Sequence, residues 1–168
     1  MSKELVLEVD LDDKPIILRP REDFYKYNII FRASSLILLN DEGNILLQKR
    51  SKSKKWFPGL YDFSVSGVVN GSESYEECMI REIKEEIGIN LKFNFLFKLT
   101  PSEKNDRSFH AVFIACTNQK LYPDINEIEL IKWISKEKLQ KDIIKNYKKF
   151  TPQLIFCLNK YFDDIDNN

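Results

Sequence analysis

The segment 67–89 constrains the fold and the chemistry of this chain more than any other stretch. Ser74, followed three residues later by Glu77, is a capping-box pattern, and Gly88 is a typical helix stop. These signals predict a helix over residues 75–87. The apolar stripe that would dock this helix on a sheet consists of Met79, Ile80, Ile83 and Ile87.

Three acidic residues on the predicted helix indicate a metal site. Glu82, Glu85 and Glu86 have the i, i+3, i+4 spacing that places side chains next to one another on a helix surface. Their carboxylates repel one another, and a hard cation such as Mg²⁺ or Mn²⁺ relieves that repulsion because it prefers oxygen ligands. Considered alone, the cluster is also compatible with a solvated acidic face partnered by Arg81 and Lys84.

Alternating apolar and polar residues predict an N-terminal β-hairpin from segments 5–9 and 15–18. Residues 21–27 could form one or two helical turns. Further strands are expected at residues 29–39, 44–50, 61–69, 91–99, 108–116 and 129–134. C-terminal helices are expected within residues 136–162, at 136–139, 143–150 and 153–162, followed by a frayed tail. The pattern indicates a single α/β domain over residues 1–168, with a mixed sheet between helices.

Composition excludes several classes of protein. Lys plus Arg and Asp plus Glu both total 26, so the basic surplus typical of proteins that bind duplex nucleic acid is missing. No stretch has the length and apolar character of a membrane span, and no targeting segment is recognisable. Three cysteines without metal-ligand spacing are expected to be buried thiols: Cys78, Cys116 and Cys157. A cytoplasmic location is the expectation.

The spacing of the whole segment matches the Nudix box, Gly-x5-Glu-x7-Arg-Glu-apolar-x-Glu-Glu-x-Gly-apolar, at every specified position. The chain therefore resembles the Nudix hydrolase superfamily, which implies an α/β/α sandwich. The resemblance implies that Glu85 and Glu86 are metal ligands, and that Glu82 is a ligand or the base that activates water. By the same resemblance, Gly67 would supply a backbone carbonyl to the metal. Glu73 and Arg81 would pair to hold the loop against the helix, and Gly88 would end the helix.

Residues outside the box are expected to complete the site. A further metal ligand is expected at Glu127, with Glu129 second. The cations Arg32, Lys49 and Arg50 precede the box and could face the phosphates of the substrate. For each of them an exposed structural role is an equal alternative. The predicted reaction is metal-dependent hydrolysis of a diphosphate linkage in a small molecule, with a nucleoside diphosphate linked to another group as the expected substrate.

Segments around the box resemble the branch that includes isopentenyl-diphosphate isomerase. They are the hairpin, Phe31-Arg-Ala33, Leu46-Leu-Gln-Lys-Arg50 and residues 58–67. Isomerase activity is disfavoured, because Phe31 replaces a family histidine, Ser108 stands where the catalytic glutamate would be, and no cysteine falls at the catalytic position. The single histidine of the chain, His110, is expected to have a structural role.

Besides the hydrolase and the isomerase, a third possible function is a non-catalytic module that binds a phosphorylated ligand. The intact set of box glutamates disfavours it. A homodimer is a possible assembly by analogy with related proteins. The aromatic residues that flank the entrance to the box loop are expected to pack that loop: Trp56, Phe57 and Tyr61.

Overall fold

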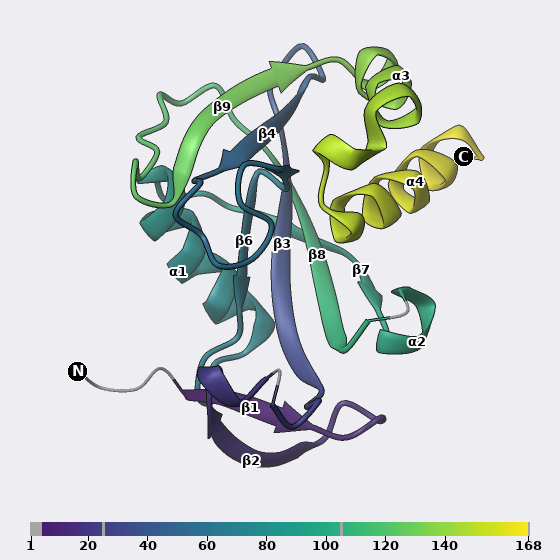
Figure 1. Cartoon of the computed structure of the whole chain (residues 1–168). Helices are drawn as coiled ribbons and strands as arrows, with labels where there is room; N and C mark the ends of the chain where they lie inside the picture. Colours follow the sequence, from purple (N-terminus) through teal and green to yellow (C-terminus); the bar gives the residue numbers. More distant parts are fainter. Residues whose placement is uncertain (1–4, 25, 105, 168) are drawn as a thin grey trace.

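The computed structural model describes residues 5–24, 26–104 and 106–167. The expected N-terminal hairpin is confirmed: β1 (Leu5–Val9) and β2 (Pro15–Pro20) pair antiparallel. A 3₁₀ turn, η1 (Arg21–Phe24), follows the hairpin. Figure 1 shows this hairpin lying across one end of the main sheet.

Within the described residues the main sheet has seven strands, in the order β5-β4-β3-β8-β7, with β6 beside β3 and β9 beside β4. The central strand β3 pairs parallel with β8 and antiparallel with β6, so the sheet is mixed. The strands are β3 (Phe31–Leu39), β4 (Ile45–Arg50), β5 (Tyr61–Asp62), β6 (Val65–Val68), β7 (Asn94–Leu99), β8 (Ser108–Cys116) and β9 (Ile128–Ile134).

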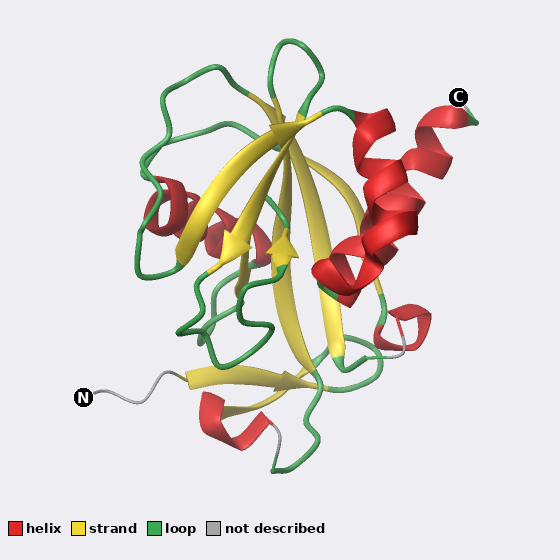
Figure 2. Cartoon of the chain, turned by 45° about the horizontal axis from the view of Figure 1, so that its top comes forward, coloured by secondary structure: helices red, strands yellow, loops and turns green. Residues whose placement is uncertain are grey.

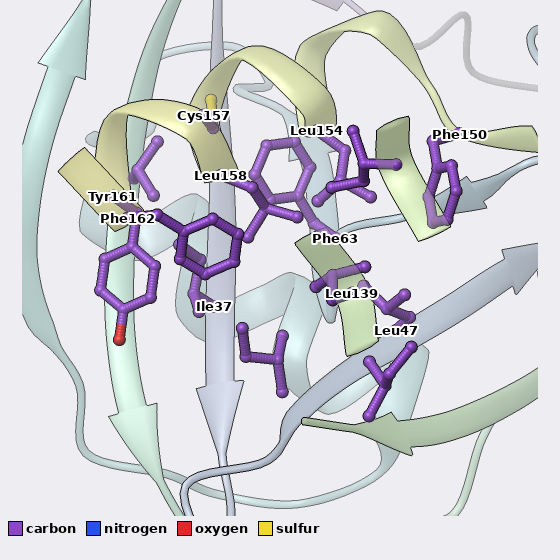
Figure 3. Packing of buried hydrophobic residues seen from close by; sticks show 14 of the residues in the cluster. Ile37, Leu47, Phe63, Leu139, Phe150, Leu154, Cys157, Leu158, Tyr161 and Phe162 are labelled. Atoms are coloured by element: carbon purple, nitrogen blue, oxygen red, sulfur yellow. The ribbon is translucent and has the colours of Figure 1, made fainter. Parts of the chain in front are cut away.

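Helices cover both faces of this sheet, which confirms the predicted sandwich (Figures 1 and 2). Helix α1 (Tyr75–Ile87) packs on one face through a core that includes Leu36 and Leu38 of β3. On the other face, Ile37 packs against α3 (Lys136–Asn146) and α4 (Pro152–Asp166), as Figure 3 shows in part. Successive side chains of a strand point to opposite faces, so one strand supplies both cores.

Helix α1 begins and ends where the sequence predicts. The Ser74 side chain accepts a hydrogen bond from the Glu77 backbone, and the Glu77 side chain accepts one from the Ser74 backbone. Gly88 caps the other end with φ of 70°. The predicted apolar stripe was wrong at one position, because Ile80 is 57% exposed and Cys78 is buried in its place.

The predicted strand 61–69 is two short strands, because this segment changes partners. β5 pairs with β4 and β6 pairs with β3. Between them Ser64 connects both neighbours: its hydroxyl donates to the Leu46 carbonyl at 2.7 Å and accepts from the Leu38 amide at 2.8 Å. Where the chain passes from β5 to β6, the Ser64 side chain thus supplies hydrogen bonds that backbone groups supply within a strand.

Other predictions needed correction. The helix predicted to end at residue 139 continues to Asn146, because Leu139 and Ile143 lie one turn apart on a single buried stripe. Helix α4 extends to Asp166, where Lys136 forms an ion pair, in place of a frayed tail. A short helix, α2 (Pro101–Lys104), was not anticipated. Cys116, the last residue of β8, is exposed rather than buried.

One carboxylate attaches the turn of the hairpin to the sandwich. Asp13, at the hairpin turn, accepts hydrogen bonds from Arg32 Nε at 2.7 Å, from the Tyr75 hydroxyl at 2.9 Å and from Lys98 Nζ at 2.8 Å. These partners keep the pKa of Asp13 below its ordinary value despite its burial. The hairpin, and η1 after it, therefore have a defined position relative to β3 and α1. In the residues described, no helix combines the length and apolar character needed to span a bilayer.

The helix stop gives a test of local stability. A Cβ on Gly88 would lie 2.9 Å from the Tyr122 Cβ, and the left-handed backbone adds its own cost. We expect Gly88→Ala to lower the free energy of unfolding by about 2–3 kcal/mol in urea titrations. Gly43→Ala is the matched control, because its φ is 74° but nothing lies within 4 Å of the added Cβ. It should cost only about 1 kcal/mol. Equal losses in both variants would show that the Tyr122 contact is unimportant.

Candidate functional site

The three acids of the box line one cleft of about 1030 Å³. Glu82, Glu85 and Glu86 reach it from α1, and Gly67 reaches it from β6. The N-terminal turn η1, the first half of β3 and the loop between β4 and β5 form other parts of its wall. The cleft is at the upper end of the size range of small-molecule sites.

Glu86 is the most buried of the three acids, with 6% of its surface exposed. Its Oε2 accepts hydrogen bonds from Gln48 Nε2 at 3.0 Å and from the Ser66 amide at 3.1 Å. Burial raises the pKa of Glu86 well above its ordinary value, and the charge of Glu82 raises it further. The two donors are neutral, so they stabilise the ionised form only in part.

Glu82 lies directly against the backbone of β6. A Cβ added to Gly67 would lie 1.8 Å from Glu82 Oε1, so only glycine leaves room for this carboxylate. Burial raises the pKa of Glu82, although the positive charge of Arg81 opposes that shift and Arg21 opposes it more weakly. Glu85 is more open, with 59% of its side chain exposed.

Arg81 connects the loop, the strand and the helix of the box. Its Nε and Nη2 donate to both carboxylate oxygens of Glu73, at 2.7 and 3.0 Å, and Nη2 also donates to the Val68 carbonyl at 3.2 Å. Its Nη1 donates to Glu82 Oε1 at 2.6 Å and to Glu85 Oε2 at 3.0 Å. The pKa of Arg81 is raised by these carboxylates.

The donor set of the box suits a hard divalent cation. As the side chains stand, the described residues contain no group of three His, Cys, Asp or Glu side chains gathered closely enough to enclose a metal ion. The guanidinium of Arg81 bridges Glu82 and Glu85 instead. Yet the negative charge of Glu82 raises the pKa of Glu86, and that of Glu85 raises the pKa of Glu82. A cation that shares these oxygens would relieve both repulsions.

The structure separates the other predicted site residues into two groups. Glu127 lines the cleft and forms an ion pair with Lys54. Arg50 also lines it, with Nη1 donating to Asp62 at 2.9 Å and Nε donating to the Trp56 carbonyl at 3.0 Å. The buried Asp62 is fixed in turn by the Thr151 hydroxyl of the α4 cap at 2.8 Å.

Arg32, Lys49 and Glu129 are not among the residues that line the cleft. Arg32 pairs with Asp13, and Lys49 pairs with Glu129 at 2.7 Å. Each basic residue occupies a strand position adjacent to a cleft-facing one, and successive side chains of a strand point to opposite faces. The Glu129 partner raises the pKa of Lys49.

Sequence reasoning missed the part of the cleft that η1 supplies. Arg21 and Phe24 both line the cleft, and in a 3₁₀ turn residues three apart lie on the same side. Their spacing was a usable signal, but the sequence does not reveal that the hairpin carries η1 to the box. Trp56 and Phe57 also line the cleft, and with 36% and 38% exposed they do not pack fully into the loop. Tyr61, the third aromatic residue of that prediction, packs against the core under α3 and α4 and is not among the cleft-lining residues.

His110 lies on β8 at the floor of the cleft. Its Nε2 is 2.6 Å from the Ser35 hydroxyl, and its ring lies 5.4 Å from that of Phe63. The histidine is buried between these neighbours. These are the contacts of a hydrogen-bonded structural histidine.

A family model described as the NUDIX domain matches residues 30–154, which is most of the chain and includes the box and the cleft. The chain belongs to the Nudix family. It is a Nudix hydrolase that acts on diphosphate bonds, and hydrolases of this family generally use divalent metals.

Curated proteins and solved structures agree with this assignment. A protein named prenyl-diphosphate phosphatase from Methanosarcina mazei is 41% identical over 164 residues, covering 95% of this chain and 96% of that protein. An isopentenyl-diphosphate Delta-isomerase 2 from Photorhabdus laumondii is 27% identical and covers 82% and 80%. The crystal structure of DR0079 from Deinococcus radiodurans superposes with a TM-score of 0.78 at 27% identity, covering 85% and 90%.

The buried charge of Glu86 gives a test in the metal-free protein. Its pKa in the folded chain is well above the ordinary 4.5, so the folded state binds this proton more tightly than the unfolded state. Its contribution to stability is therefore present below 4.5 and is lost as pH rises through the raised pKa. At neutral pH we expect Glu86→Gln to be more stable than the wild type by roughly 1–3 kcal/mol, with the difference vanishing in acid.

Urea unfolding from acid to neutral pH, in the presence of a chelator, measures this difference. The control is Glu85→Gln, which removes an exposed carboxylate and should change stability by less than about 0.5 kcal/mol. A Glu86→Gln variant whose stability follows the wild-type curve at every pH would refute the buried-charge account.

Proposed function

We propose that this hydrolase cleaves the phosphoanhydride bond of prenyl diphosphates in a reaction that depends on Mg²⁺ or Mn²⁺. The observation that carries the proposal is the cleft itself, where Glu82, Glu85 and Glu86 share one cavity with cationic and aromatic side chains. The similarity to the prenyl-diphosphate phosphatase of Methanosarcina mazei, which extends over nearly the full length of both chains, supports the substrate class.

Oxygen ligands of the box would hold the cation. Glu85, Glu86 and the Gly67 carbonyl are its proposed ligands, with Glu127 completing the set from the loop before β9. When bound, the cation would neutralise the oxygens of the diphosphate and lower the pKa of a coordinated water. The protein contributes a fixed geometry, because the Ser66 amide and Gln48 hold Glu86 in place.

Glu82 is the proposed general base. Its pKa, raised by burial, makes this carboxylate a stronger base than an ordinary glutamate. The close fit against Gly67 and the hydrogen bond from Arg81 fix the position of its carboxylate. Glu73 acts through Arg81, as a positioning residue that keeps the loop against the helix.

Cations on the walls of the cleft would bind the phosphate oxygens of the substrate. Arg50 is held in a defined orientation by Asp62 and the Trp56 carbonyl, and Arg21 projects from η1 near enough to lower the pKa of Glu82. Lys54 stands with Glu127 at the same cleft. Arg32 and Lys49, which face away from it, are assigned structural parts in their ion pairs with Asp13 and Glu129.

The proposed reaction adds one water across the P–O–P linkage of the diphosphate, breaking the bond between the terminal phosphorus and the bridging oxygen. The water oxygen forms a bond to the terminal phosphorus, and the bridging oxygen leaves with the electron pair of the broken bond. Glu82 takes the proton of the water and releases it to solvent. The products are a prenyl monophosphate and inorganic phosphate.

Nucleoside diphosphates linked to another group are the second candidate substrate. The partly exposed rings of Trp56 and Phe57 at the cleft favour it, because exposed aromatic faces can stack on a base. Isomerisation is not proposed, since Ser108 carries no acid at the position of the isomerase glutamate. A non-catalytic role is disfavoured by the complete set of box glutamates. A homodimer and a cytoplasmic location stay predictions.

A substrate panel tests the function. Purified protein with Mg²⁺ or Mn²⁺ should release phosphate from geranylgeranyl and dimethylallyl diphosphates faster than from ADP-ribose or nucleoside triphosphates, with prenyl monophosphate as the organic product. Glu86→Gln and Glu82→Gln should each lower kcat by about 10²–10³-fold or more, because each removes a group that acts in the transition state.

Glu76→Gln is the matched control, since Glu76 lies on the same helix but is not among the cleft-lining residues, and its activity should be that of the wild type. Faster turnover of ADP-ribose than of every prenyl diphosphate would move the assignment to the nucleoside class. Equal activity of the wild type and both site variants would exclude the proposed site.

A further inference from the structure

One wall of the cleft is built from hydrocarbon side chains beside the carboxylates. The rings of Phe24 and Phe31 stack with centroids 4.4 Å apart and an interplanar angle of 16°. Both rings line the cleft, together with Ala33 and Val68. We call Phe24, Phe31 and Val68 the aromatic wall.

The aromatic wall is preformed. Phe24 is 3% exposed, and it packs with the buried Val6 of β1 and Ile29, while Phe31 and Val68 pack against the same cluster. This small core is separate from the two cores under the helices, and it joins the hairpin to β3. Because the rings are supported from behind, an apolar ligand would gain contact area without first ordering the wall.

The aromatic wall adjoins the box carboxylates at Val68. Val68 follows Gly67, whose backbone lies against Glu82, and the Val68 carbonyl accepts a hydrogen bond from Arg81. On the other side, Phe24 is three residues from Arg21, the cation that acts on Glu82. A diphosphate held between the acids and Arg21 would therefore place its organic group beside the two rings.

Small side chains leave space in front of the wall. Ala33 lies two residues after Phe31, on the same face of β3, and Ser108 pairs with Phe31 in the neighbouring strand β8. The side chains that form and support the wall are hydrocarbons, so they reward burial of an alkyl group. The side chains of the wall offer a ribose or a base no hydrogen bonds in place of those it makes to water.

We propose that the aromatic wall is the subsite that binds the hydrocarbon group next to the diphosphate, and that Phe31 is its main specificity-determining residue. This inference rests on the proposed function and adds the residues that select the substrate. Phe31 is the better candidate of the pair because it is only partly buried, whereas Phe24 is almost fully enclosed.

The test compares kcat/KM for geranylgeranyl diphosphate, methyl diphosphate and ADP-ribose in the wild type and in Phe31→Ala. Methyl diphosphate offers the same phosphates without a chain that can reach the wall. We expect Phe31→Ala to lower kcat/KM for geranylgeranyl diphosphate by about 10–100-fold, mostly through a higher KM, because contacts with a hydrocarbon group that does not react bind substrate and transition state equally. Turnover of methyl diphosphate should stay within about threefold of the wild type.

Phe93→Ala is the control for loss of a ring as such. Phe93 is also partly buried and packs edge-on against Phe113 at 5.0 Å, but it does not line the cleft. It should leave all three kcat/KM values within about threefold of the wild type. If Phe31→Ala fails to fold, Phe31→Leu keeps an apolar side chain at the position and should still lose at least about threefold with geranylgeranyl diphosphate alone.

The outcomes separate this inference from the proposed function. A wild type that cleaves geranylgeranyl diphosphate, with a Phe31 variant that is unchanged or that loses activity equally on methyl diphosphate, would overturn the aromatic wall alone. A wild type that cleaves ADP-ribose but no prenyl diphosphate would overturn the proposed substrate class, and the wall with it. Selective loss on geranylgeranyl diphosphate supports both.

Discussion

The guanidinium of Arg81 is the contact on which the geometry of the site depends. It holds Glu73 through two hydrogen bonds, touches the β6 backbone at Val68, and reaches Glu82 and Glu85. One cation thereby joins the strand, the loop and the helix of the box. It also neutralises part of a carboxylate cluster that is otherwise self-repelling. The same bridge occupies oxygens that a divalent cation would share, so binding of a metal would be coupled to the loop geometry through one side chain.

Local signals made the box predictable. Helix α1 has the predicted ends because Ser74, Glu77 and Gly88 act through hydrogen bonds and dihedral angles within a few residues. The N-terminal hairpin was predictable in the same way, from the alternation of apolar and polar residues along the chain. The division of segment 61–69 into two strands was not predictable, because it depends on hydrogen bonds from Ser64 to two strands that are distant in sequence. The length of α3 was missed since polar residues between Leu139 and Ile143 interrupt the sequence pattern but not the buried stripe.

The walls of the cleft were less accessible to sequence reasoning than its acids. Whether Arg32 faces the cleft depends on which face of β3 the cleft opens, a property of the assembled sandwich. Its pairing with Asp13 instead anchors the hairpin, and the hairpin carries Arg21 and Phe24 to the site. By its resemblance to the isomerase branch, the chain has Phe31 in place of a histidine. Its stacking on Phe24 gives that position a positive role in an apolar surface.

Mn²⁺ binding followed by electron paramagnetic resonance tests whether the box carboxylates form a divalent-cation site. The free Mn²⁺ signal is measured as protein is added, for the wild type, Glu86→Gln and the control Glu76→Gln. We expect the wild type and Glu76→Gln to remove the signal alike, and Glu86→Gln to bind Mn²⁺ at least about tenfold more weakly because it has lost a charged ligand. Equal Mn²⁺ affinity in all three proteins would contradict a cation site at these carboxylates.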